Sequence, residues 1–296
     1  MKSIIDSSDK KNLKKKFNCP ICSDVSLFIF TSKHARDIYE CTNKDCGHFM
    51  TIPHMENQGI VPRYENVERL SDININIYGE RNERLLKLLL NWLKNKNYPI
   101  TFLDYGAGNA HVSRTFKKVL DTKVKIYCLE ANPAFQDLYQ KYGLIQIATP
   151  NELKEKIDFI YMIEVIEHLE DPIATMKQLR QSLNKNGSIF LSTPLGTRIE
   201  NATNAYDTPS HLHFFSKKSF NLMLNKSGFT EIIFKHYSEM YPLTSNKYHK
   251  LKIAIKKLIL NSFLKFLIPK KKVMHLVGLT RPINVKPIQS KPLEHS

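Results

Sequence analysis

Four cysteines near the N-terminus form the first group of residues whose types and spacing could do chemistry. They stand as two pairs, Cys19 with Cys22 and Cys41 with Cys46, among short β-like runs. Four thiolates at this spacing can surround Zn²⁺ tetrahedrally, and the glycine after the second pair allows a tight metal-binding turn. An iron–sulfur cluster has no supporting spacing. Because so short a segment has little apolar core, we predict that structural Zn²⁺ on these four cysteines supplies its folding energy.

A second group lies in residues 103–110, Leu-Asp-Tyr-Gly-Ala-Gly-Asn-Ala, between a predicted strand and a predicted helix. Gly106 and Gly108 permit a tight turn and a close backbone approach to a ligand. Asp104 ends the strand, where its carboxylate could accept hydrogen bonds from the ammonium group of a cofactor. Glu130 ends the next strand, where an acid can bind ribose hydroxyls. The alternative is an ordinary strand–helix turn with two surface acids.

Glu164, Glu167 and His168 form a third group, directly after another predicted strand. Ligands of open α/β sheets bind at the carboxyl ends of strands. His168 could therefore act as a general base that takes a proton from a reacting hydroxyl. The structural alternative is that Glu167 and His168 only cap the turn before Asp171 and Pro172.

Three other histidines and one cysteine are also of residue types that can bind a metal or act in catalysis. His211 and His213 alternate, so on an extended segment both would face one side. One of them could act in catalysis or substrate binding, or both could satisfy backbone carbonyls in a packed loop. His48 could replace a thiolate at the zinc site, although it resembles a strand residue. Cys128 lies in a predicted buried strand, where it would pack.

The elements that must position these groups alternate in the manner of βαβ units. Parallel strands buried on both faces produce short apolar runs. Such runs predict strands at 100–103, 123–129, 144–148, 159–163, 188–192, near 231–234 and at 273–279. Helical spacing predicts helices at 80–96, 112–120, 133–142, 172–183 and 220–226. The pattern predicts an α/β fold with a Rossmann-like, doubly wound, seven-stranded sheet.

Three segments carry a family resemblance when taken in order: Asp-Tyr-Gly-Ala-Gly at 104–108, Glu-Ala-Asn-Pro at 130–133, and the stretch 158–169 with its Glu-Val-Ile-Glu-His block. They resemble the motifs of class I S-adenosylmethionine-dependent methyltransferases, within them the ubiquinone-pathway O-methyltransferase-like branch (methyltransferase-23/11-like). The segment Ser-His-Leu-His-Phe-Phe-Ser at 210–216 is also similar to that branch. The resemblance covers roughly residues 60–236. A dinucleotide oxidoreductase would not explain the Glu-Val-Ile-Glu-His block.

The resemblance assigns the cofactor-binding positions residue by residue. They are Asp104, Gly106 and Gly108 at the methionine end, Glu130 at the ribose, Ala131 and Asn132 near the adenine, and Ile163 and Glu164 beside the cofactor. It also implies a divalent cation such as Mg²⁺ on Glu164, Glu167 and His168, which would lower the pKa of an acceptor hydroxyl. Three interpretations of Glu167 and His168 stay open: ligands of a metal, a metal-free general base, or a structural cap of the turn. The candidate catalytic residues are Glu167, His168, His211 and His213.

Five regions are expected along the chain. A flexible leader occupies 1–16, a zinc-ribbon-like module 17–56 and the methyltransferase domain 57–283, followed by a disordered tail at 284–296. A basic helical insertion at 238–272 interrupts the methyltransferase domain. The leader has no apolar signal-peptide core, and no stretch of the chain is apolar enough to span a membrane. We therefore expect a cytoplasmic protein.

The formal net charge of +16 is concentrated toward the C-terminus, because no acidic residue lies between Glu239 and Glu294. Residues 247–272 interleave lysine with apolar residues, as in a basic amphipathic helix. Such a helix could pack on the core, mediate dimerisation, or lie on the inner face of an anionic membrane. A nucleic-acid partner is not expected, because no aromatic reading surface or RNA-binding motif accompanies the charge.

The function expected from these features is O-methylation of a small hydroxylated acceptor. An N-terminal zinc-binding module also occurs in some sugar methyltransferases with a similar core, which favours a saccharide or a surface-polysaccharide precursor. Two alternatives stay open. They are C-methylation of a nucleotide sugar and a non-catalytic zinc-ribbon scaffold built on a degenerate methyltransferase fold.

Overall fold

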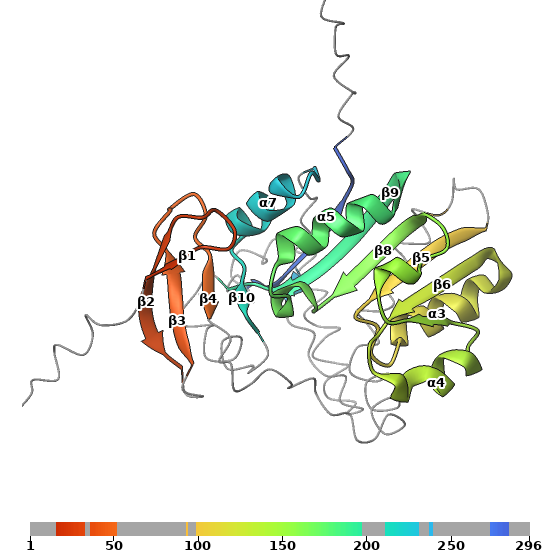
Figure 1. The fold of residues 1–296 in the computed structure, drawn as a ribbon. Coiled ribbons are helices and arrows are strands. Elements are labelled where there is room, and N and C mark those ends of the chain that lie inside the picture. The colour runs from red at the N-terminus through yellow and green to blue at the C-terminus, as the bar shows by residue number, and fades with distance from the viewer. Residues whose placement is uncertain are drawn as a thin grey trace, which may run out of the picture.

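The computed structural model describes residues 16–32, 36–51, 93, 99–196, 211–230, 237–238 and 273–283. The predicted helix at 80–96 (except Leu93, which is helical), the strand near 231–234 and the basic segment 247–272 lie outside these residues. Two sheets organise the described part of the chain (Figure 1). None of its helices is long and apolar enough to cross a bilayer.

The larger sheet has the strand order β11-β12-β9-β8-β5-β6-β7. Its strands are β5 (Ile100–Tyr105), β6 (Val124–Leu129), β7 (Ile145–Ile147), β8 (Ile157–Ile163), β9 (Leu183–Pro194), β11 (Tyr237–Ser238) and β12 (Val273–Thr280). The strands from β9 to β7 pair in parallel, whereas β12 pairs antiparallel with β9 and β11 antiparallel with β12. The strand order reverses between β5 and β8, and a ligand crevice is expected outside the carboxyl ends of strands at such a switch point.

Helices cover both faces of this sheet, as the doubly wound pattern predicts (Figure 1). They are α3 (His111–Leu120), α4 (Gln136–Lys141), α5 (Pro172–Ser182) and α7 (Lys217–Lys226). Alternate residues of β5 and β8 enter two separate cores. Phe102 and Phe159 pack with α3, whereas Leu103 and Ile160 belong to the core that contains side chains of α5 and α7. The predicted α/β fold is therefore confirmed.

The cysteine-bearing segment folds as an antiparallel sheet with the order β1-β2-β3-β4-β10. Its strands are β1 (Phe17–Asn18), β2 (Val25–Thr31), β3 (Asp37–Cys41), β4 (Phe49–Thr51) and β10 (His213–Phe214). Strand β10 lies much later in the sequence than the other four strands, between β9 and α7. It lies beside β4 in Figure 1, with His213 opposite Met50 and Phe214 opposite Phe49. A strand from the methyltransferase region therefore completes the sheet of the N-terminal module.

Local differences from the predicted elements have identifiable causes. The helix predicted at 133–142 begins as a 3₁₀ turn, η4 (Pro133–Phe135), and α4 ends before Gly143, whose φ is +63°. Helix α7 begins at Lys217 because the Ser216 side chain accepts a hydrogen bond from the Ser219 amide. Gly187 lies within β9, where a Cβ atom would come within 3.0 Å of the Ile157 carbonyl oxygen.

Candidate active site and metal centre

The glycine loop after β5 lies against the end of β6 and the loop that follows β8. The amides of Gly106 and Ala107 both donate to the carbonyl of Leu129, at 3.0 and 3.1 Å. Gly106 has φ +74°, and a Cβ atom there would lie only 2.6 Å from Cγ2 of Val165. Gly108 has φ +50°, but a Cβ atom there would meet nothing within 4 Å. Gly106 therefore permits close packing against Val165, and Gly108 borders open space that a ligand can enter.

The third small residue of the motif is Ala110 rather than glycine, and it also has a left-handed backbone, with φ +50°. It is fully buried and precedes the first residue of α3. A left-handed conformation costs a residue with a Cβ atom about 1–2 kcal/mol. Such strain persists where the surroundings fix the backbone, as functional sites often do. Ala110 therefore keeps a left-handed turn at a position where glycine would be less strained.

Glu130 lies at the edge of this open space and is held by backbone amides. Its Oε2 accepts a hydrogen bond from the amide of Gly108 at 3.0 Å, and its Oε1 accepts one from the amide of Asn132 at 2.9 Å. Gln146 fixes the same turn by donating to the carbonyls of Glu130 and Asn132. An ionised carboxylate has about four acceptor positions, so two further hydroxyl donors could still bind. Ala131 is exposed on this turn.

Asp104 is buried, whereas Glu130 is only partly buried, although both acids lie at the ends of neighbouring strands. Its buried carboxylate accepts hydrogen bonds from Ser113 on α3 at 2.9 Å and from Tyr161 on β8 at 2.7 Å. Burial raises the pKa of Asp104 to about 7, and the two hydrogen bonds oppose this rise. Asp104 therefore ties the start of the glycine loop to the helix and strand beside it.

Glu164 begins the loop after β8 with φ +55°, a left-handed conformation that is uncommon for residues other than glycine. Its side chain accepts a hydrogen bond from the Ser192 hydroxyl, and its amide donates to the Ser192 carbonyl at 2.9 Å. Ile163, the residue before it, packs against the core beside α3. The predicted ligand set of Glu164, Glu167 and His168 differs from what the structure assembles, because Glu164 points to β9.

The group that the structure brings together is Glu167, His168 and His211, whose ligand atoms all lie within 4.8 Å of one another. Oε1 of Glu167 is 3.9 Å from Nε2 of both His168 and His211, and Oε2 accepts from the Thr193 hydroxyl at 3.0 Å. The two imidazole rings meet edge to face at 4.6 Å. Glu167 is 1% exposed and the His168 side chain 31% exposed, so His168 is the member that a substrate can reach.

His213 has other partners, in contrast to the expectation that it shares a side with His211. Its Nε2 lies 2.8 Å from the Leu169 carbonyl, and its Nδ1 lies 3.1 Å from Nε2 of His48. A carbonyl only accepts, so Nε2 of His213 donates; in the neutral ring Nδ1 then accepts from His48. Burial lowers the pKa of His213 to about 4. No local sequence pattern indicates this role of His48, because its partner is 165 positions away.

The four predicted zinc ligands converge at one place in the N-terminal module. The Sγ atoms of Cys19 and Cys46 are 3.8 Å apart, those of Cys22 and Cys41 are 3.3 Å apart, and all four lie within 4.8 Å of one another. Tetrahedral ligands with Zn–S bonds of about 2.3 Å would lie about 3.8 Å apart. A hydrogen bond from Cys46 lowers the pKa of Cys19 to about 5, which favours a thiolate. The donor set therefore fits structural Zn²⁺.

Comparisons with known proteins indicate the family to which this chain belongs. A family model described as a methyltransferase domain matches residues 78–232. The tRNA U34 carboxymethyltransferase of Campylobacter lari is 47% identical over 53 residues, 18% of this chain and 18% of that protein. The same enzyme of Campylobacter jejuni (strain ATCC 700819 / NCTC 11168) is 42% identical over 53 residues, with the same coverage of both chains. The matched stretch is thus less than a fifth of these relatives.

Two solved structures are similar in outline. The plantazolicin methyltransferase BpumL, solved with S-adenosylhomocysteine and a triazolic desmethylPZN analogue, has 15% identity and a TM-score of 0.49, with 75% of this chain and 92% of that chain covered. YcgJ of Bacillus subtilis has 15% identity and a TM-score of 0.48, with 69% and 100% covered. The family model covers more than half of the sequence. The chain therefore belongs to the methyltransferase-domain family, and its predicted membership of the class I S-adenosylmethionine-dependent methyltransferases is confirmed.

Proposed function

We propose that this protein transfers the methyl group of S-adenosylmethionine to a hydroxyl of a small acceptor. The observation that carries the proposal is the contact between the glycine loop and the loop after β8. A Cβ atom on Gly106 would lie 2.6 Å from Val165, and Val165 is only two residues before Glu167. The open space at Gly108 and the Glu167–His168–His211 group therefore belong to adjoining loops at one end of the sheet, where a cofactor and an acceptor could meet.

The residues of the glycine loop fit the cofactor. Gly108 leaves room beside the backbone, and Glu130 keeps acceptor capacity at the edge of that room. We assign Glu130 to the ribose hydroxyls, Asn132 and Ala131 to the adenine side, and Gly106 and Gly108 to the methionine side. Asp104 acts through Ser113 and Tyr161 by holding the loop. The bound cofactor supplies an electrophilic methyl group, and alignment of the acceptor oxygen with it provides much of the rate enhancement.

His168 is the proposed general base. The acceptor oxygen forms its bond to the methyl carbon while the carbon–sulfur bond breaks, and the hydroxyl proton passes to the imidazole of His168. The buried carboxylate of Glu167 lies 3.9 Å from Nε2 of His168 and would stabilise the imidazolium that forms. His211 lies at the same distance from the same oxygen of Glu167 and places a second imidazole beside it.

A divalent cation is the competing interpretation of the same three residues. Two imidazoles and one carboxylate are donors that suit zinc, iron or manganese, whereas Mg²⁺ prefers oxygen ligands. The group Glu167, His168 and His211 therefore fits Mg²⁺ less well than the set with Glu164 that the sequence suggested. This donor chemistry favours a metal-free base over catalysis that depends on Mg²⁺.

A saccharide or surface-polysaccharide precursor is the acceptor class that we propose. It carries hydroxyls for deprotonation, and the cysteine module beside the methyltransferase sheet is the feature shared with sugar methyltransferases. A nucleoside of RNA is a second candidate, favoured by the 53-residue similarity to tRNA U34 carboxymethyltransferases and by the net charge of +16. C-methylation of a nucleotide sugar would use the same cofactor site.

The test is an acceptor screen with S-adenosylmethionine labelled in its methyl group. Free sugars, nucleotide sugars and bulk tRNA serve as separate acceptor pools, and each product is analysed for O-methyl or C-methyl carbon by NMR. Label in the sugar pools that requires His168 supports the proposal. Label in tRNA alone would move the RNA candidate to first place. A zinc-loaded, folded protein that neither binds the cofactor nor transfers label would be a scaffold.

A further inference from the structure

The segment 211–216 connects the acceptor side of the proposed site to the cysteine module. On the site side, the amide of Leu212 donates to the carbonyl of Glu167 at 2.8 Å. His211, the neighbouring residue, places its Nε2 3.9 Å from the Glu167 carboxylate. The position of this segment therefore decides where two of the three residues of the Glu167–His168–His211 group lie.

On the module side, strand β4 holds the same segment by its backbone. The amide of Thr51 donates to the carbonyl of Leu212 at 3.0 Å, and β4 and β10 pair antiparallel. The buried guanidinium of Arg36 donates to the carbonyl of His211. Phe214 packs in a small core with Ile38 and Phe49, both of which belong to the module.

A buried row of polar side chains makes a second attachment. It runs from Ser219 on α7 through His48 and His213 to the carbonyl of Leu169, with distances of 3.4, 3.1 and 2.8 Å. Leu169 follows His168 directly in the sequence. His48 lies two residues after Cys46 and bonds His213 rather than completing the cysteine cluster. The row thus joins the metal-binding turn to the loop that carries His168.

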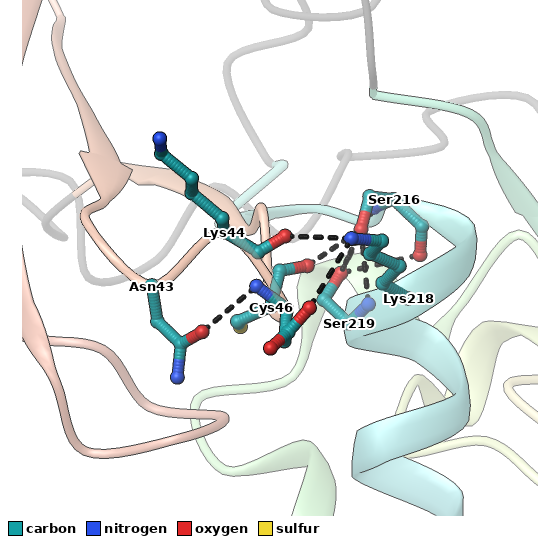
Figure 2. A network of polar contacts seen from close by, with 7 residues as sticks. Asn43, Lys44, Cys46, Ser216, Lys218 and Ser219 are labelled. Atoms are coloured by element: carbon teal, nitrogen blue, oxygen red, sulfur yellow. Dashed lines mark hydrogen bonds and ion pairs between the residues drawn. The ribbon is translucent and has the colours of Figure 1, made fainter.

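A third attachment, shown in Figure 2, joins the turn at Cys46 to the start of α7. The Ser216 hydroxyl donates to the carbonyl of Cys46 at 2.7 Å, and Lys218 Nζ donates to the carbonyl of Lys44 at 2.9 Å. Ser216 is also the N-cap of α7, so one side chain serves both the helix and the metal-binding turn. This turn is formed by the amides of Cys46 and Gly47, which both donate to Asn43.

We propose that the metal-bound cysteine module fixes the acceptor side of the active site, and that His48 and His213 are the positioning residues that transmit this constraint. The assignment of the acceptor side rests on the proposed function. The separate core of the module is small, so metal bound to the four cysteines would add to its folding energy. Metal binding and the ordering of 211–216 are then thermodynamically linked, so each strengthens the other.

The cofactor side should be independent of this constraint. Among the described contacts, the partners of Gly106, Gly108 and Glu130 are Leu129, Asn132 and other residues outside the module. Metal removal should therefore loosen 211–216 while it leaves the binding of S-adenosylhomocysteine unchanged. Unchanged binding of S-adenosylhomocysteine would show that metal removal has not unfolded the whole protein.

Hydrogen exchange of the full chain, with Zn²⁺ bound and after chelation, measures the link without any acceptor. We expect the amides of 211–216 to exchange at least about ten-fold faster after chelation, because their partners in β4 lose order. The amides of β6, residues 124–129, should change by less than about two-fold. Unchanged protection of 211–216 after complete metal loss would overturn the proposal.

A reciprocal measurement uses two substitutions that differ only in reach. His48→Gln can place an amide nitrogen near the position of Nε2 and keep the bond to His213, whereas His48→Asn is too short. Linkage predicts that His48→Asn binds Zn²⁺ at least about five-fold more weakly than wild type in competition with a chromophoric chelator, and that His48→Gln recovers most of the lost affinity. Tyr39→Phe, on β3 and separated from β10 by β4, should match wild type.

Calorimetry with S-adenosylhomocysteine completes the design. Wild type and both His48 variants should bind it with the same affinity. If the wild type itself fails to bind, the proposed function fails, while exchange and Zn²⁺ affinity still decide the positioning role. If His48→Asn binds Zn²⁺ as tightly as wild type, the positioning role is wrong even though the cofactor binds.

Discussion

Nε2 of His48 lies 3.1 Å from Nδ1 of His213, although 165 positions of sequence separate the two residues. Both rings are buried, and the pair joins the turn after Cys46 to the loop that holds His168. A buried polar contact is costly unless both partners are satisfied. The two parts of the chain therefore form one polar network between the four-cysteine cluster and the proposed active site.

Gly106→Ala should weaken cofactor binding at least about ten-fold and lower the free energy of unfolding by about 2 kcal/mol or more. The new methyl group would enter a left-handed backbone and clash with Val165 at 2.6 Å. Gly143→Ala is the matched control, because φ is +63° but the nearest atom, Cε of Lys117, is 3.4 Å away and flexible. Urea unfolding and calorimetry measure both variants. Equal cofactor affinities would contradict the account of the loop.

Asp104→Asn should flatten the dependence of stability on pH. The pKa of Asp104 is about 7 in the folded protein and near 3.8 when unfolded, so the folded state binds the proton more tightly. This contribution is fully present below about pH 4 and is lost as the pH rises through about 7, by at most about 4 kcal/mol. Urea unfolding at pH 5 and pH 8 tests it. If wild type and Asp104→Asn both gain stability in parallel between pH 5 and pH 8, the pKa of Asp104 is not raised in the folded protein.

Cys22→Ser should abolish stable Zn²⁺ binding, because the remaining three thiolates leave the tetrahedral site open. Cys128→Ser is the control, since Cys128 is buried in β6 and outside the cluster. Native mass spectrometry should find one Zn²⁺ per chain in wild type and in Cys128→Ser. A full complement of Zn²⁺ in Cys22→Ser would exclude the four-cysteine centre.

His168→Ala should lower kcat by about 10²–10⁴-fold once an acceptor is known, which is the usual contribution of a general base. The affinity for S-adenosylmethionine should change by less than about two-fold, because His168 lies outside the glycine loop. Glu167→Gln should act in the same direction by removing the charge 3.9 Å from the imidazole. Undiminished turnover in both variants would assign the proton transfer elsewhere.

Local chemistry made much of this fold predictable. The apolar run before Asp104, the glycines after it and the helical spacing from Val112 predict a strand, a turn and a helix, and β5 and α3 match them closely. The helix predicted at 220–226 is found as α7, with Ser216 as its N-cap. These features depend on residues within one or two turns of one another, which is the range over which sequence patterns carry information.

The parts that sequence could not supply depend on distant partners. The pairing of β4 with β10 joins residues more than 160 positions apart, and nothing in either short strand specifies the other. Glu164 was expected beside Glu167, but its left-handed backbone directs its side chain to Ser192. His211 comes near Glu167 because the segment before β10 is hydrogen-bonded through Leu212 to Glu167 on one side and to Thr51 on the other. Tertiary pairing therefore determined the composition of the proposed catalytic group.

The most direct test of the central claim is a calorimetric titration of the zinc-loaded protein with S-adenosylmethionine, in wild type, Glu130→Gln and Glu155→Gln. Glu130 accepts from Gly108 beside the open space, whereas Glu155 pairs with Lys125 on the surface. We predict saturable one-to-one binding that Glu130→Gln weakens by about 10–100-fold, the equivalent of one hydrogen bond to a charged group, and that Glu155→Gln leaves unchanged. No binding by the folded wild type, or equal binding by all three proteins, would contradict the account.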